Sequence, residues 1–229
     1  MALYAIGDLH LSFAQEKPMD IFGELWKNHG ERVKQFWLSN VNNQDTVLVP
    51  GDISWALRLG DARQDLEWLN ALPGRKIMVK GNHDYWWQSI SKLNQAFPDM
   101  VFLQNSYVKY EDYAICGTRG WLCPNSANFT EHDYKIYRRE VLRLRNSLEQ
   151  AANDKWEKII VMMHFPPTNE KHETSEFTKL AEAYQVEKVI YAHLHGENYY
   201  CAGFQGVRNE VEYYLVSCDY LQCKPLIIL

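Results

Sequence analysis

The stretch KIMVKGNHD, residues 76–84, decides the fold and the chemistry that the sequence suggests. Its apolar residues have the pattern of a short strand, and Gly81 then permits the sharp turn that places Asn82, His83 and Asp84 directly after that strand. An amide, an imidazole and a carboxylate are groups that bind metal ions and transfer protons. In an open α/β sheet, ligands bind at the carboxyl ends of the strands. This stretch therefore predicts an α/β sheet with a polar site at that edge.

The same arrangement recurs four more times along the chain. Further apolar runs end in candidate ligands, which are Asp8 with His10, Asp52, His164, and His193 with His195. If these strands share one direction, their last residues meet at one edge of a sheet. Together with Asn82 they are seven candidate ligands, more than one ion needs and suitable for two. Imidazole combined with carboxylate favours transition metals over Ca²⁺ or Mg²⁺.

The rest of the chain alternates short β-rich runs with helical ones, which predicts an α/β layered fold. We expect strands over 2–6, 46–49, 76–79, 158–163 and 188–192. We expect helices over 31–40, 61–72 with Asp61 as N-cap, 85–95, 130–152 with Thr130 as N-cap, and 175–184. Short runs between 101 and 117 predict antiparallel strands, and 199–217 predicts a hairpin that turns at 205–206. Because no linker interrupts the pattern, we expect a single domain over 1–229.

Composition excludes several classes of protein. The chain has 229 residues, a net charge of −5 and 46% hydrophobic residues, which excludes a disordered chain. Charges or turn residues interrupt every apolar run before the roughly 18 residues that a membrane span needs. The mild acidity argues against a general nucleic-acid surface. The five Cys residues include no CxxC pair, and no secretory signal is evident, so we expect free thiols and a cytoplasmic location.

The ordered motifs D-x-H, GD, GNHD, H and H-x-H, over residues 7–195, resemble those of the calcineurin-like metallophosphoesterases, of the bacterial phosphohydrolase type. The resemblance implies a four-layer α/β/β/α sandwich of two mixed β-sheets flanked by helices. Two departures are visible. Ala192 stands where the family usually has Gly, and residues 53–58 lack the GDxVDRG pattern of the Ser/Thr protein phosphatases, which argues against a phosphoprotein substrate.

The resemblance also implies roles for individual residues. Two divalent ions (Mn, Fe or Zn) are implied, with Asp8, His10 and His195 on the first, Asp52 bridging, and Asn82, His164 and His193 on the second. His83 matches the catalytic histidine that meets the leaving group, and Asp84 matches the acid that orients it. The implied reaction is hydrolysis of phosphate mono- or diesters by a metal-activated hydroxide.

Other residues admit two interpretations. Arg119, between turn residues, could bind a substrate phosphate together with Asn82, or be an ion-paired loop residue. The aromatic run 85–87 could stack a nucleobase, but a role in the core is favoured. The basic run in the helix over 130–152 is interpreted as a solvated face balanced by Glu140 and Glu149. His29, His132 and His172 lie outside the motifs and are expected at the surface.

Two alternative functions stay open. One is a non-catalytic metal-binding interaction module on the same fold, although such relatives usually lose ligands that this chain retains. The other is a nuclease, which the acidity disfavours. The expected partner is a small phosphate ester, with no membrane and no nucleic acid. The sequence does not indicate the physiological substrate, the choice between monoester and diester, the metal used in vivo or the oligomeric state.

Overall fold

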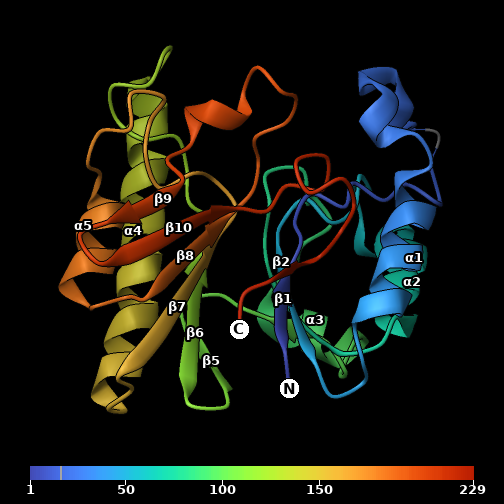
Figure 1. The fold of residues 1–229 in the computed structure, drawn as a ribbon, viewed down its shortest axis with the longest axis horizontal. Helices are drawn as coiled ribbons and strands as arrows, with labels where there is room; N and C mark the ends of the chain where they lie inside the picture. The colour runs from blue at the N-terminus through green and yellow to red at the C-terminus, as the bar shows by residue number, and fades with distance from the viewer. Residues whose placement is uncertain (16) are drawn as a thin grey trace. The chain divides into compact units, whose positions relative to one another are not determined.

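The computed structural model describes residues 1–15 and 17–229, and its contacts divide the chain into two compact units. Unit 1 comprises Met1–Phe102 and Val216–Leu229, and unit 2 comprises Leu103–Leu215. Each unit has its own sheet (Figure 1). Each also has its own cluster of buried hydrophobic residues. The single domain expected over 1–229 stays a prediction.

Unit 1 contains a mixed five-stranded sheet in the order β11-β1-β2-β3-β4. Its strands are β1 (Leu3–Ala5), β2 (Thr46–Pro50), β3 (Arg75–Val79), β4 (Val101–Phe102) and β11 (Leu226–Ile227). The first four run parallel, and β11 is antiparallel to β1. Because β1, β2 and β3 are parallel neighbours, their carboxyl ends lie at the same edge of the sheet.

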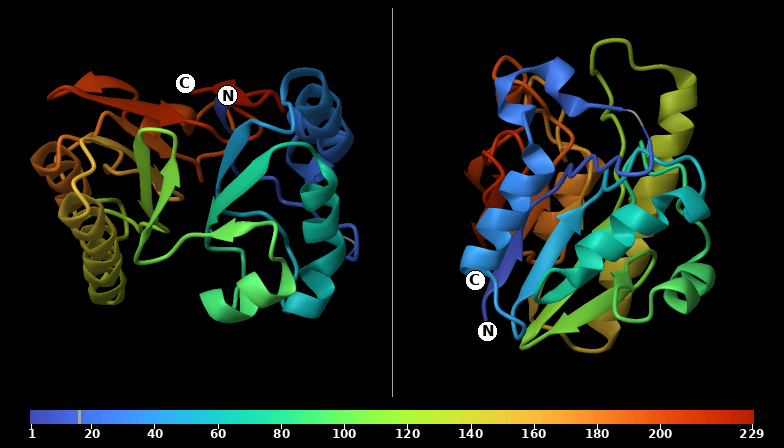
Figure 2. Two further views of the ribbon diagram at one scale, coloured as in Figure 1. Left: turned by 90° about the horizontal axis from the view of Figure 1, so that it is seen from below. Right: turned by 90° about the vertical axis from the view of Figure 1, so that its right-hand side faces the viewer.

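Helices cover a face of this sheet. They are α1 (His29–Asn40), α2 (Leu59–Ala71) and α3 (Ile90–Ala96), with the 3₁₀ turns η1 (Met19–Phe22) and η2 (Glu24–Trp26). Figure 1 and the right-hand view of Figure 2 show α1 and α2 lying against the strands. Trp37 of α1 and Leu66 of α2 are fully buried in one cluster with Val47 and Val49 of β2. Amphipathic burial of this kind fixes both helices on the sheet.

Unit 2 contains a mixed six-stranded sheet in the order β5-β6-β7-β8-β10-β9. Its strands are β5 (Tyr107–Tyr110), β6 (Tyr113–Thr118), β7 (Lys158–Met163), β8 (Lys188–Tyr191), β9 (Gly206–Arg208) and β10 (Val211–Leu215). The four central strands are parallel, and each edge strand is antiparallel to its neighbour. β7 and β8 therefore also end at a common edge.

The helices of unit 2 are α4 (Glu131–Asn153) and α5 (Glu176–Ala183), with the 3₁₀ turn η3 (Tyr200–Ala202). As predicted, Thr130 caps α4, in a capping box with Asp133. Tyr137, Leu144 and Leu148 of α4 are buried in the core of this unit. Both helices lie on the same side of the sheet (Figure 1).

Local details differ from the sequence-based expectations. Helix α3 begins at Ile90 rather than at 85, because Trp86 and Trp87 are buried in the core of unit 1 and hold the preceding segment as turns. Helix α2 begins earlier than expected, so that Asp61 lies in its first turn and Arg58 is the N-cap.

Two strand pairings also differ. β5 and β6 form the expected antiparallel pair, but β4 pairs in parallel with β3 in the sheet of unit 1. The hairpin of β9 and β10 turns at Asn209 and Glu210, whose φ angles are 48° and 67°. A two-residue turn with positive φ at both positions matches the twist of the strands, whereas a turn at 205–206 would not join these paired residues.

The fold-class prediction is confirmed as an α/β fold with two mixed β-sheets flanked by helices. Among the described residues, none of the helices combines the length and the apolar character required for a membrane span.

Candidate metal centre

In unit 1 the loops after β1 and β2 run alongside each other beyond the sheet. The Asp8 N–H donates to the Gly51 carbonyl at 3.0 Å, and the His10 N–H donates to the Asp52 carbonyl at 2.9 Å. The ladder of the two parallel strands thus continues through the candidate ligands. His10 Nε2 and Asp52 Oδ2 lie 3.7 Å apart, and both side chains are buried.

The backbone at these ligands is in an unfavourable conformation. Asp8, His10 and Asp52 have φ angles of 55°, 43° and 50°, in the left-handed region. Such a conformation costs an L-residue about 1–2 kcal/mol. It persists where the surroundings fix it, and strained residues of this kind cluster at functional sites. In unit 2, His193 shares the feature, with φ of 74°.

Gly81 packs so closely against Asp52, in the loop after β2, that no residue with a Cβ atom fits there. A Cβ at this position would lie 2.1 Å from Asp52 Oδ1 and 2.2 Å from the Asp52 nitrogen. The space that glycine leaves lets the His83 N–H donate to Asp52 Oδ1 at 2.8 Å. The GNHD turn after β3 and the GD turn after β2 are in this way fixed to each other.

Asp84 is fully buried between the same two turns. Its carboxylate accepts from the backbone N–H groups of Gly81 at 2.8 Å and Ile53 at 2.9 Å, and from the Trp86 indole at 3.0 Å. Burial, followed by the charge of Asp52, raises the pKa of Asp84 to about 7. These hydrogen bonds join the turn after β2 to the turn after β3 through the Asp84 carboxylate. The predicted role of Asp84 in orienting the imidazole of His83 stays a prediction.

An aromatic residue that the motifs do not include contacts both His10 and His83. The ring of Trp55 stacks on His10 with 4.7 Å between centroids and lies 4.4 Å from the ring of His83. The sequence signal was weak, a single tryptophan three residues after Asp52. Trp55 therefore belongs to the site although sequence reasoning missed it.

His29 was expected at the surface and is instead half-buried beside the first ligand loop. Its Nε2 lies 2.9 Å from the Leu9 carbonyl, and its Nδ1 lies 3.2 Å from the Trp26 carbonyl. Burial lowers the pKa of His29. This histidine holds the turn that carries Asp8 and His10.

Unit 2 supplies imidazoles at the ends of β7 and β8. His164 is buried, and its Nε2 lies 3.2 Å from Nδ1 of the half-buried His193. The Ala192 N–H donates to the His164 carbonyl at 3.0 Å, and the methyl group that replaces the usual glycine hydrogen is fully buried. His195 follows two residues later and is also half-buried. The structure brings His164 and His193 together as predicted.

Arg119 is bound to a buried carboxylate. Its guanidinium lies 3.2 Å from Glu140 Oε1 and stacks over the Trp121 ring at 4.5 Å from the centroid. Glu140 is fully buried and also pairs with Arg143 at 2.8 Å. Glu140 is therefore buried and forms ion pairs with arginines, whereas the sequence predicted that it lies on a solvated face of the helix. The phosphate contact expected for Arg119 stays a prediction.

The aromatic run after the GNHD turn has split roles. Trp86 and Trp87 are buried in the core, as favoured, whereas Tyr85 is 59% exposed.

One pair of donor atoms within each unit has the spacing that a transition-metal ion requires. Ligands that lie about 2.0–2.2 Å from one ion are about 2.8–3.8 Å apart for angles of about 90–120°. The 3.2 Å between His164 and His193 falls in this range, and the 3.7 Å between His10 and Asp52 lies at its upper end. The mixture of carboxylate and imidazole suits Mn, Fe or Zn.

Comparison with known proteins decides the family. A family model described as "Calcineurin-like phosphoesterase" matches residues 1–197. The chain belongs to the calcineurin-like phosphoesterase family. The predicted family is thereby confirmed, and with it the class of metal-dependent phosphoric ester hydrolases.

Individual relatives are distant. The "Gene 66 protein" of Mycobacterium phage L5 is 32% identical over 77 residues, which make up 34% of this chain and 37% of that protein. The phosphopantetheinyl hydrolase PptH of Mycobacterium tuberculosis shares the fold, with 16% identity, a TM-score of 0.62 and coverage of 100% of this chain and 95% of that one. The protein of unknown function AQ665 from Aquifex aeolicus has 17% identity and a TM-score of 0.56, covering 99% and 95%.

Proposed function

We propose that this member of the calcineurin-like phosphoesterase family hydrolyses phosphate mono- or diesters at a dinuclear metal centre. The observation that carries the proposal is the convergence of donor atoms at the ends of parallel strands in each sheet. His10 and Asp52 follow β1 and β2, and His164 and His193 follow β7 and β8. Five strands that each end in a ligand are difficult to explain by packing alone.

In the proposed centre the residues that match the family motifs hold two ions. One ion would be held by Asp8, His10 and His195, the other by Asn82, His164 and His193, and Asp52 would bridge them. Such ions supply Lewis acidity and lower the pKa of water to roughly 7, so that a nucleophile exists at neutral pH. Mn, Fe or Zn suits the donors, and a cytoplasmic location is part of the proposal.

The chain's own residues would perform the remaining steps. His83 would protonate the leaving oxygen, a contribution typically worth about 10²–10⁴-fold in rate. Asp84 would hold the turn that carries His83, through the hydrogen bonds to Gly81 and Ile53. Asn82 and Arg119 would bind the non-reacting phosphate oxygens.

The test is hydrolysis of p-nitrophenyl phosphate and bis-p-nitrophenyl phosphate by the full chain loaded with Mn²⁺, Fe²⁺ or Zn²⁺, against chelated protein. We expect turnover of at least one ester that chelation abolishes. Metal-loaded protein that binds ions but hydrolyses neither ester nor any other phosphate ester would instead indicate a non-catalytic module. Degradation of DNA or RNA without hydrolysis of the small esters would indicate a nuclease.

The role of His83 has its own test. If His83 protonates the leaving group, His83→Gln should cost more with phenyl phosphate, a poor leaving group, than with p-nitrophenyl phosphate. His132→Gln, on the exposed side of α4, is the matched control and should change neither rate. An equal loss with both esters would contradict the role in proton transfer.

A further inference from the structure

Unit 2 contains a small pocket beside the proposed ligand His193. Its volume is about 110 Å³. Side chains from three loops line it, including Trp121, Cys123, Phe165, Thr168, His193 and Ala202. We call it the His193 pocket.

Aromatic rings connect this pocket to the imidazole. The ring of Phe165 lies 4.0 Å from the ring of His193, and the ring of Trp121 lies 4.8 Å from that of Phe165. Leu194 and Ala202 add further apolar surface to the lining. A ligand that fills the pocket would therefore contact mostly carbon, directly beside a residue of the proposed metal centre.

One polar group in the wall is unused. Thr168 is 4% exposed and lines the pocket, and its hydroxyl has no hydrogen-bond partner among the described residues. A buried hydroxyl without a partner costs about 1–3 kcal/mol. The hydroxyl is covered by protein atoms, so a rotation of the Thr168 side chain toward the pocket would let a ligand atom accept its hydrogen bond and remove this cost.

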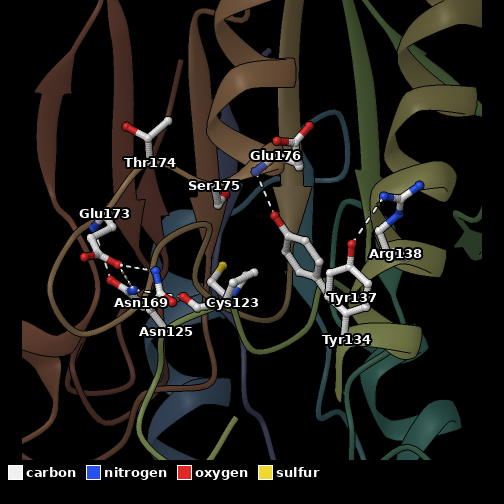
Figure 3. Close-up of a pocket in the computed structure, with 11 residues that line it drawn as sticks. Cys123, Asn125, Tyr134, Tyr137, Arg138, Asn169, Glu173, Thr174, Ser175 and Glu176 are labelled. Atoms are coloured by element: carbon white, nitrogen blue, oxygen red, sulfur yellow. Dashed lines mark hydrogen bonds between the residues drawn. The ribbon is translucent and has the colours of Figure 1, made fainter. Parts of the chain in front are cut away.

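The neighbouring pocket shows the opposite situation. It is larger, about 230 Å³, and shares Cys123 and Asn169 with the His193 pocket. Figure 3 shows the residues that line it. Its wall uses its own polar groups, since the Glu176 N–H donates to the Tyr137 hydroxyl at 2.7 Å and Asn169 donates to Glu173 at 2.7 Å. These contacts fix the loops that also form the wall of the His193 pocket. Because these polar groups already pair with one another, they do not indicate a ligand.

We propose that the His193 pocket binds the organic group of the ester substrate, a largely apolar group of about one aromatic ring that carries one hydrogen-bond acceptor for Thr168. This inference rests on the proposed function. The size follows from the volume, because a closed apolar cavity of about 150 Å³ holds a benzene ring. A ring fits partly inserted, whereas a whole nucleoside does not.

The first test compares two inert analogues, phenylphosphonate and methylphosphonate, as inhibitors of p-nitrophenyl phosphate hydrolysis by the Mn²⁺-loaded enzyme. We expect phenylphosphonate to bind about tenfold more tightly, because its ring is buried. Ala202→Phe should fill the pocket and remove this preference, while leaving the inhibition constant of methylphosphonate within about twofold. Ala202→Leu is a smaller replacement that serves if the phenylalanine variant does not fold.

The second test isolates the hydroxyl. Thr168→Val should weaken binding of the best of the 2-, 3- and 4-hydroxyphenylphosphonates by about fivefold or more and leave phenylphosphonate equal or tighter. Thr174→Val makes the same chemical change at an exposed position of the neighbouring pocket and should change neither.

The outcomes separate the two proposals. Wild-type enzyme that is active but binds both phosphonates equally, or an Ala202 variant that folds and keeps the preference, would overturn the assignment of the pocket. Wild-type protein without activity toward any ester would overturn the proposed function, and direct calorimetric titration with the two phosphonates would then still measure whether the pocket binds a ring.

Discussion

Unit 1 buries the carboxyl groups of Asp8, Asp52 and Asp84 at the ends of its parallel strands, where burial, followed by the charge of Asp52, raises the pKa of Asp84. Unit 2 buries one carboxylate away from its histidines, and Glu140 there is matched by Arg119 and Arg143. Buried carboxylates next to one another destabilise a protein unless cations neutralise them. Unit 2 therefore supplies its own counter-charges, whereas the carboxylates of unit 1 need the metal ions that we propose.

The largest expected effect comes from the carboxylate in the middle of the unit 1 site. Asp52→Asn should lower turnover of the metal-loaded enzyme on the order of 10³-fold. In chelated protein the same change should raise the melting temperature by about 2–4 °C, because a buried charge beside Asp84 disappears. His164→Asn should also reduce turnover but should not raise the melting temperature. A metal-free Asp52→Asn protein less stable than the His164→Asn variant would refute the comparison.

The corresponding change in unit 2 should have the opposite sign. Glu140→Gln should lower the free energy of unfolding by about 3 kcal/mol, because it leaves partly buried arginines without their anion. Arg139→Ala, which removes a side chain that is 55% exposed and 3.7 Å from Glu140, is the control and should cost less than about 1 kcal/mol. Urea denaturation measures both, and equal costs would show that Glu140 is not the centre of the cluster.

A glycine tests how tightly the unit 1 loops are joined. Gly81→Ala should destabilise the protein by about 2 kcal/mol and weaken metal binding, because the added methyl group collides with Asp52. Gly60→Ala, in helix α2 with no atom within 4 Å of the new Cβ, should be neutral or stabilising by about 0.5–1 kcal/mol. Denaturation curves and metal titrations of the two variants check this. Equal stability and equal metal affinity of the two variants would mean that the loops after β2 and β3 can move apart to accommodate the methyl group.

A pH dependence of the metal-free protein tests the same comparison without a substitution. The pKa of Asp84 is about 7 in the folded protein against 3.8 without the fold. Between these values the folded state binds more protons than the unfolded state. The contribution of Asp84 to stability is therefore complete below about pH 4 and is lost as the pH rises to about 7, by at most about 1.4 kcal/mol per pH unit.

The control for this pH dependence is Asp52→Asn in the presence of chelator. Without the charge of Asp52 the pKa of Asp84 falls, so the stability should decrease less steeply between about pH 5 and about pH 7. Parallel curves for the two proteins would show that Asp52 does not act on Asp84.

Features with a local physical cause could be predicted from the sequence. The hydroxyl of Thr130 next to an amphipathic run defined the start of α4, and apolar runs followed by Asp8, Asp52 or His164 identified strands that end in candidate ligands. Features that depend on distant partners were missed. The start of α3 depends on burial of Trp86 and Trp87, and the partner of β4 is a strand more than twenty residues away in the sequence.

The amino-acid sequence alone determined the family, the alternation of strands and helices, and the kind of ligands, because each depends on residue type and short spacing. The tertiary structure decided that Glu140 is buried and paired with arginines, that Asp84 joins two loops, and that Trp55 contacts both His10 and His83. These contacts join residues far apart in the sequence, and no local pattern specifies which side chains a folded chain brings into contact.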